Sequence, residues 1–211
     1  RKSTIIGFDI KKIDLKKKKL NRKNIEIFCG SQIDEVFINN LILKYGKFDI
    51  IIDDGSHFPK HVIKTFNLLF KSLATNGIYF IEDTQTSYNH YFGGNAFDLK
   101  FSNTHVNYFK SLTDSLNYQE IANPFYKKNK FDGFIKNISF FHNMIVLKKG
   151  INNNKSNLVL NNSYEDKRYI SRLKIKGDKK RYFFKYLVIF KTYTFLLLIF
   201  NTFKKIILFR Y

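Results

Sequence analysis

Two runs of mostly apolar residues, 48–52 and 78–81, stand out in the pattern of hydrophobic and polar positions along the chain. Apolar runs of this length are typical of strands that are buried on both faces of a parallel sheet. Between them, apolar side chains recur at helical spacing, at Val62, Phe66, Leu69 and Leu73. Pro59 favours the first turn of this helix, and Asn76 with Gly77 favours its end. The pattern therefore predicts a β-α-β unit.

The rest of the pattern extends this unit into an α/β domain. Strands are predicted at residues 4–8, 25–29, 135–141 and 144–147, and helices at residues 34–44 and 104–116. In the second helix one apolar face is formed by Val106, Phe109, Leu112 and Leu116. His142 and Asn143 separate the last two strands, as the turn of a hairpin does. The predicted fold class is α/β, with a mostly parallel sheet.

Acidic residues and one histidine follow the two apolar runs at their carboxyl ends. Asp54 and His57 come after the first run, and Glu82 and Asp83 come after the second. Consecutive parallel strands joined by one helix are often neighbours, so their carboxyl ends lie side by side. Open α/β sheets bind ligands at that edge. We therefore expect these four side chains to meet in one crevice.

Three carboxylates in one crevice raise one another's proton affinity unless a cation lies between them. Their oxygen atoms favour Mg²⁺, Mn²⁺ or Ca²⁺ over zinc. His57, three positions after Asp54, is then a candidate general base. In a simpler interpretation, Asp53 and Asp54 cap the helix that follows. Glu82 and Asp83 are then solvated loop acids.

The motifs IDDGSH and YFIEDTQTSY, followed by Gly93 and Gly94, resemble those of the metal-dependent sugar O-methyltransferases of the macrocin and mycinamicin type. These are class I S-adenosylmethionine-dependent methyltransferases, to which cephalosporin-hydroxylase-like and rhamnosyl O-methyltransferase proteins are related. The resemblance covers approximately residues 5–150. It implies a Rossmann-like fold, in which an antiparallel C-terminal hairpin closes the sheet.

The resemblance also implies roles for individual residues. Asp54, Glu82 and Asp83 would hold Mg²⁺ or Mn²⁺. His57 would remove the proton from a sugar hydroxyl as its oxygen attacks the methyl carbon of S-adenosylmethionine. The implied function is methyl transfer to an oxygen of a sugar or glycoconjugate. A different reaction on the same fold, as in the hydroxylase-named relatives, stays open.

Class I methyltransferases begin with an earlier strand and a glycine-rich loop, which have no counterpart in this sequence. By resemblance, residues 1–10 correspond to the second strand, whose terminal acid, here Asp9, hydrogen-bonds the cofactor ribose. Ser31 and Gln32 are implied adenine contacts, and Asp53 completes the implied cofactor set. For Ser31, a role as the cap of the next helix stays open. We therefore expect an N-terminally truncated form of the fold.

The basic excess of the chain lies at its ends. The formal net charge is +20, yet residues 25–150 hold 13 basic and 12 acidic side chains. We expect residues 1–150 to form the methyltransferase-like domain and the polar, basic residues 151–182 to form a linker. Residues 183–211 are apolar and basic, which favours a helix at a membrane interface, or equally one packed on the domain or a dimer partner.

The neutral body argues against nucleic acid as the partner of the domain. The single cysteine, Cys29, excludes an internal disulfide and fits a cytoplasmic location. A peripheral membrane contact and a homo-oligomer stay open. The rival interpretation is a non-catalytic partial domain whose basic ends bind membrane or nucleic acid.

Overall fold

The computed structural model describes residues 3–12, 23–121, 123 and 125–153. The chain divides into two compact units, Arg1–Tyr118 with Lys128–Asn154 and Gln119–Lys127 with Lys155–Tyr211. The described strands and α-helices belong to the first unit. The predicted tail, and nearly all of the predicted linker, lie outside the described residues. Within the described part of the chain, no helix is both long and apolar enough to cross a membrane.

Six strands form two sheets in the described residues. In the smaller sheet, β1 (Ile5–Asp9) pairs in parallel with β2 (Ile25–Cys29). The larger sheet has the order β3-β4-β6-β5, with the bounds Phe48–Asp53, Leu73–Glu82, Met144–Lys149 and Ile135–Phe141. β3 and β4 are parallel, whereas β6 is antiparallel to both of its neighbours. The predicted β-α-β unit and closing hairpin are confirmed.

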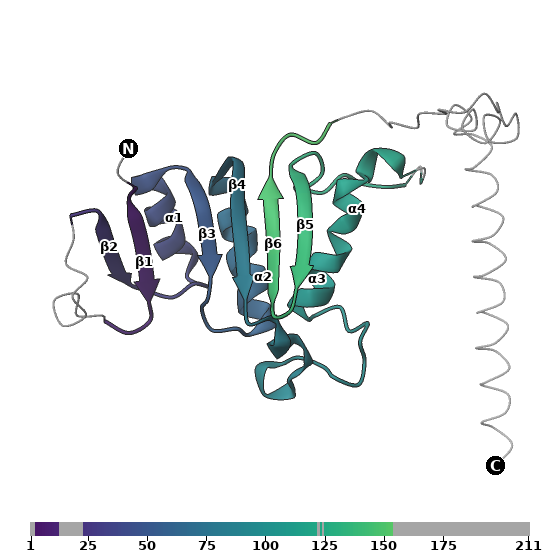
Figure 1. Cartoon of the computed structure of the whole chain (residues 1–211), viewed down its shortest axis with the longest axis horizontal. Coiled ribbons are helices and arrows are strands. Elements are labelled where there is room, and N and C mark those ends of the chain that lie inside the picture. Colours follow the sequence, from purple (N-terminus) through teal and green to yellow (C-terminus); the bar gives the residue numbers. More distant parts are fainter. Residues whose placement is uncertain (1–2, 13–22, 122, 124, 154–211) are drawn as a thin grey trace, which may run out of the picture. The chain divides into compact units, whose positions relative to one another are not determined.

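The two sheets stand next to each other at β1 and β3, which run in the same direction (Figure 1). On that side neither strand pairs with another described strand. The carboxyl ends of β1, β3 and β4 lie along one edge (Figure 1). Residues that follow these strands are therefore placed near one another.

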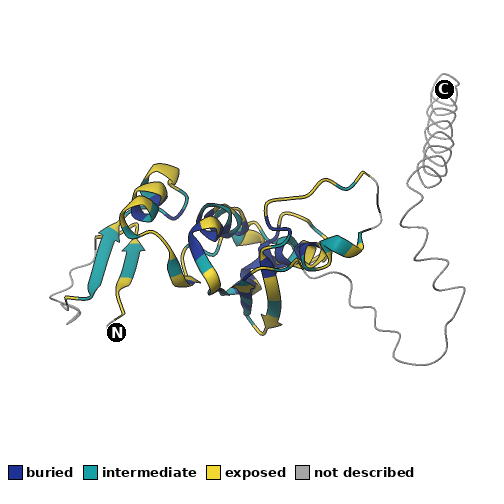
Figure 2. Cartoon of the chain, turned by 90° about the horizontal axis from the view of Figure 1, so that it is seen from above, coloured by how far each residue is buried: buried dark blue, intermediate teal, exposed yellow. Residues whose placement is uncertain are grey.

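The helices of this unit lie on one side of the strands (Figure 2). They are α1 (Glu35–Tyr45), α2 (Pro59–Leu69), α3 (His105–Ser111) and α4 (Thr113–Leu116). Alternation along β3 shows the result, because Ile51 is buried while Ile50 and Ile52 are 59% and 60% exposed. The larger sheet thus buries one face against helices in the described structure, so the prediction that β3 is buried on both faces was wrong.

Phe66 of α2 occupies the centre of the core. Its ring centroid lies between 4.8 and 5.3 Å from those of Phe109, Tyr79 and Phe131. Aromatic pairs at this spacing add to the free energy gained by burial. These contacts hold α2 against β4 and α3. Because α2 is held in place, so is the point at which the loop from β3 enters the helix.

Two helix predictions were partly wrong, one in where the helix ends and one in its continuity. α2 stops at Leu69, and Leu73 already belongs to β4. Asn76 and Gly77 do not end the helix but lie inside β4, beside a shift in its register with β3. The helix predicted over residues 104–116 is divided into α3 and α4. Tertiary pairing with β3 and the core contacts override local helical spacing here.

Candidate active site

Two loops at adjacent strand ends form the candidate site. Because β3 and β4 pair in parallel as far as Asp53 and Ile81, the residues after them leave the sheet side by side. Asp54, His57 and Asp83 each offer one ligand atom, and these atoms lie within 4.8 Å of one another. The structure therefore brings three of the four expected side chains together.

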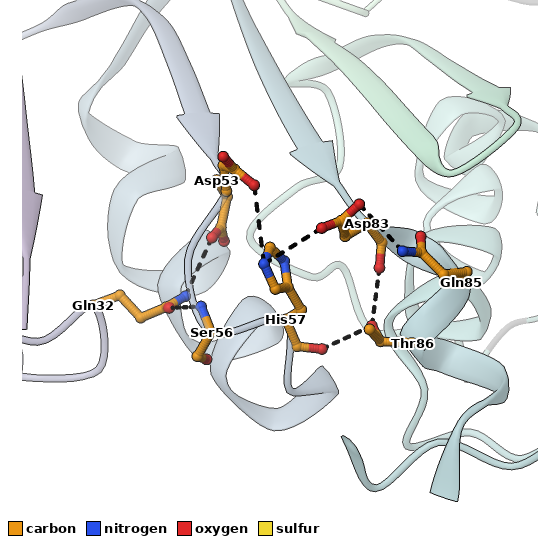
Figure 3. Close-up of polar contacts among 8 residues, drawn as sticks. Gln32, Asp53, Ser56, His57, Asp83, Gln85 and Thr86 are labelled. Atoms are coloured by element: carbon orange, nitrogen blue, oxygen red, sulfur yellow. Dashed lines mark hydrogen bonds and ion pairs between the residues drawn. The ribbon is translucent and has the colours of Figure 1, made fainter. Parts of the chain in front are cut away.

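The imidazole of His57 points toward the carboxylate of Asp83 (Figure 3). Its Nε2 atom is 3.5 Å from Asp83 Oδ2 and 3.9 Å from Asp54 Oδ1. The side chains of His57, Asp83 and Asp54 are 22%, 47% and 62% exposed, so the imidazole is sheltered while the carboxylates face solvent. A ligand or ion from solution therefore has access to both acids beside the imidazole.

Glu82 lies outside this cluster. It is the last residue of β4, is half-buried, and is in register with Met144 of β6. Successive strand side chains point to opposite faces, so Glu82 shares its face with Phe80. Its role as a metal ligand stays a prediction.

Asp53 is buried beneath the loop between β3 and α2. Burial raises the pKa of Asp53 to about 6, while hydrogen bonds from the Gly55 backbone and from Gln32 act in the opposite direction. Gln32 Nε2 donates to Asp53 Oδ1 at 3.2 Å and to Thr65 Oγ1 at 3.0 Å. Gln32 Oε1 accepts the Ser56 N–H at 2.7 Å. The buried amide of Gln32 thus fastens the start of the loop to β3 and α2.

Asp9 and Ser31 lie at the carboxyl ends of the smaller sheet. Asp9 is exposed, and its Oδ1 accepts the Lys11 N–H at 2.7 Å. The Asp9 carbonyl accepts the N–H of Gly30, which joins the ends of β1 and β2 next to Ser31. These positions suit contacts to a ligand at this edge, and the cofactor roles of Asp9, Ser31, Gln32 and Asp53 stay predictions.

The capping alternatives were wrong. Asp34, not Ser31, caps α1, because its side chain accepts the N–H groups of Val36 and Phe37. The N-cap position of α2 is Phe58, which makes no side-chain cap bond, so neither Asp53 nor Asp54 caps that helix. Capping of α2 therefore does not explain why Asp53 and Asp54 stand at this position.

Sequence reasoning missed the supporting residues of the 3-10 helix η2 (Thr84–Tyr88). Thr86 Oγ1 donates to the carbonyl oxygens of His57 and Asp83, and Gln85 Nε2 donates to Asp83 Oδ1 at 3.2 Å (Figure 3). The only available signal was their position directly after the Glu-Asp pair in YFIEDTQTSY.

Curated proteins of known activity are similar to most of the described region. The chain is 36% identical over 149 residues to mycinamicin VI 2''-O-methyltransferase of Micromonospora griseorubida, which covers 70% of this chain and 36% of the relative. It is 35% identical over 149 residues to demethylmacrocin O-methyltransferase of Streptomyces fradiae, with 70% and 37% covered. The chain thus spans just over a third of the length of these relatives.

Solved structures agree with this result. The MycE methyltransferase of the mycinamycin biosynthetic pathway, in complex with Mg, SAH and mycinamycin VI, matches with a TM-score of 0.65 and 34% identity. The match covers 72% of this chain and 38% of MycE. MycE with Mg and SAH in crystal form 1 gives a TM-score of 0.69 at 30% identity, with 80% of this chain and 43% of MycE covered. No protein-family model matches the chain.

The sheet order of the described region and these similarities match the fold of methyltransferases whose solved structures hold Mg and SAH. Over about 70% of its own length, the chain is thus similar to the mycinamicin VI and demethylmacrocin O-methyltransferases.

Proposed function

We propose that this chain is part of an S-adenosylmethionine-dependent, divalent-metal-dependent O-methyltransferase that acts on a sugar or glycoconjugate hydroxyl. The cluster of Asp54, His57 and Asp83 carries the proposal, in a chain 34% identical to a methyltransferase described with Mg and SAH. Fold similarity alone does not fix a reaction, whereas acids and an imidazole within reach of one another restrict the chemistry.

The donor set fits a hard dication. Asp54 and Asp83 supply carboxylate oxygens at an exposed edge, which suits Mg²⁺ or Mn²⁺, and we propose Glu82 as the third acid. When bound, such an ion lowers the pKa of a coordinated hydroxyl and orients it. Two acids held this close together are otherwise left to repel each other.

His57 is proposed as the general base. Its Nε2 atom lies 3.5 Å from Asp83 Oδ2 and 3.9 Å from Asp54 Oδ1, so the imidazole stands directly beside the proposed ligands of the dication. The hydroxyl oxygen bonds to the methyl carbon as the carbon–sulfur bond breaks, and the hydroxyl proton passes to His57. The sulfonium sulfur leaves as a neutral thioether, so the protein has mainly to align and deprotonate the acceptor.

We assign the methyl donor to the edge formed by the ends of β1, β2 and β3. Asp9, Ser31, Gln32 and Asp53 are the proposed contacts. The exposed carboxylate of Asp9 suits ribose hydroxyls, whereas the buried amide of Gln32 is already engaged by three protein groups. A cytoplasmic location, a homo-oligomer and a membrane contact through residues 183–211 stay predictions.

The test compares Asp54→Asn and His57→Ala with two matched controls in the full chain. Asp49→Asn removes an exposed carboxylate from β3, and His142→Ala removes an exposed imidazole from the hairpin turn. We expect Asp54→Asn to weaken Mn²⁺ binding, measured by electron paramagnetic resonance, about tenfold or more. His57→Ala should reduce methyl transfer by a factor on the order of 10² to 10⁴, and both controls should match the parent chain.

Methyl transfer is measured with labelled S-adenosylmethionine and two acceptors, mycinamycin VI and a rhamnosyl glycoside. Full activity in EDTA would contradict the metal role. Equal activity of His57→Ala and His142→Ala would contradict the base assignment. Lack of Mn²⁺ binding by the parent chain would contradict the site itself.

A further inference from the structure

Thr86 joins the two loops that carry His57 and Asp83. Its Oγ1 atom lies 2.8 Å from the carbonyl oxygen of His57 and 3.0 Å from that of Asp83 (Figure 3). A hydroxyl has one proton, so the two carbonyl oxygens share it. Thr86 is buried, and solvent therefore does not readily replace its hydroxyl.

The two residues that accept this hydrogen bond have the same uncommon backbone conformation. φ is 57° at His57 and 53° at Asp83, in the left-handed region that residues other than glycine seldom adopt. Such conformations persist where surrounding contacts hold them. Thr86 contacts the carbonyl group of each residue directly, so it holds both conformations at once.

The sheet by itself does not fix the two loops relative to each other. Pairing between β3 and β4 ends at Asp53 and Ile81, so His57 is four residues and Asp83 two residues beyond the last pair. Past that point the Thr86 hydroxyl bridges the two backbones. This bridge therefore limits how far the His57 imidazole and the Asp83 carboxylate can move apart.

Thr86 is itself held in place by the segment that follows it. Its carbonyl accepts the N–H of Asn89 at 3.1 Å, and a Cβ atom at Gly94 would lie only 2.3 Å from the same oxygen. The next residue, Ser87, accepts the N–H of Val106 from α3 at 3.2 Å. The bridge is therefore anchored to the helical layer.

We propose that Thr86 is a positioning residue that holds His57 and Asp83 at the mutual distance that metal binding and proton transfer require. The effect on metal binding and proton transfer rests on the proposed function. The effect of Thr86 on the backbone of His57 and Asp83 does not. Without the hydroxyl, the two loops lose their shared hydrogen bond, and the carbonyl groups of His57 and Asp83 lose a donor.

The test compares Thr86→Val, which keeps the shape but loses the hydroxyl, with Thr86→Ser, which keeps the hydroxyl. Thr84→Val is the matched control, since Thr84 is a buried threonine of the same turn whose hydroxyl makes no hydrogen bond to the described residues. The first measurement is the backbone ¹³C and ¹⁵N chemical shifts of His57 and Asp83 without metal. We expect Thr86→Val to move both sets of shifts, and Thr86→Ser and Thr84→Val to leave those of His57, which is remote in sequence from both positions, unchanged.

The second measurement is the Kd for Mn²⁺. We expect about a tenfold increase for Thr86→Val and less than a twofold change for Thr86→Ser. Unchanged shifts in Thr86→Val would overturn the inference, whatever the chain does with metal. If the parent chain does not bind Mn²⁺, the proposed function fails while the shift experiment still decides the role of Thr86. Should the valine variant not fold, Thr86→Ala removes the hydroxyl without demanding space.

Discussion

Asp53 and His105 are buried ionisable residues behind the candidate site, and burial acts on both by disfavouring charge. It raises the pKa of Asp53 to about 6 and lowers that of His105 to about 4. Neither ring nitrogen of His105 makes a well-formed hydrogen bond within the described residues, and a backbone interaction with Thr84 only partly opposes the effect of burial. As pH falls, the raised pKa of Asp53 therefore adds to the stability of the folded chain, whereas the lowered pKa of His105 reduces it.

His105 should make the chain sensitive to acid. Its pKa is about 4 in the folded chain and close to 6.5 in the unfolded chain, so the unfolded state binds the proton more strongly between these values. The stability that neutral His105 confers is fully present above pH 6.5 and is lost as pH falls from 6.5 to 4. We expect this residue to remove about 3 kcal/mol of unfolding free energy over that window.

The measurement is urea unfolding of the parent chain and His105→Gln at pH 7 and pH 4.5. Because Asp53 has a raised pKa, it adds stability as pH falls through 6, and it acts equally in both proteins. The difference between them therefore isolates His105. Parallel pH profiles for the two proteins would show that the histidine is not held neutral by burial.

At the scale of elements, Lys149 of β6 ties the sheet to the end of α2 and the turn after it. Its Nζ atom donates to the carbonyl oxygens of Phe70, Lys71 and Leu73 at 2.9, 3.1 and 2.7 Å. Partial burial lowers the pKa of Lys149, with the neighbouring Lys47 acting in the same direction. One ammonium group thus satisfies three carbonyls where the chain passes from helix to strand.

Lys149→Met should lower the free energy of unfolding by about 1 to 3 kcal/mol, because it removes charge-assisted hydrogen bonds to three carbonyl groups. The adjacent exposed Lys148 offers the control, and Lys148→Met should change stability by less than about 0.5 kcal/mol. Thermal or urea unfolding at pH 7 gives both values. Equal stability of the two variants would show that the three hydrogen bonds contribute little.

At the scale of the whole molecule, the described strands differ in how many neighbouring strands they pair with. β4 and β6 are paired on both sides within a four-stranded sheet, whereas β1 and β2 form a two-stranded sheet of their own. Two-stranded sheets are only marginally stable unless other elements cover them. The smaller sheet is joined to the rest of the unit through Gln32, which bonds Asp53 and Thr65, and through α1, whose Glu35 pairs with Lys64 of α2 at 3.0 Å.

Native-state hydrogen exchange should therefore show two levels of protection. We expect amides of residues 5–9 and 25–29 to exchange at least about tenfold faster than those of β4 and β6, because local opening of the smaller sheet requires less free energy. Mass spectrometry of proteolytic fragments resolves these segments. Equal protection would mean that both sheets open only when the whole unit unfolds.

The acids of the candidate site were accessible from sequence because they follow apolar runs that are typical of neighbouring parallel strands. Residues 48–52 and 78–81 lie within β3 and β4. The partners that hold the site were not accessible, since Gln32 and Thr86 act on loops far from them in sequence. Glu82 illustrates the same limit, because it ends β4 and lies outside the described cluster that the adjacent Asp83 joins.

Hydrophobic periodicity alone determined the α/β class, the β-α-β unit and the edge at which the acids gather, because burial of apolar runs leaves few arrangements of strands and helix. Only the tertiary structure decided which acids meet. That depends on the register of β3 against β4, on the left-handed backbone at His57 and Asp83, and on hydrogen bonds between distant segments. Such long-range contacts leave no local trace in the sequence, because the residues that make them are common polar types without periodicity.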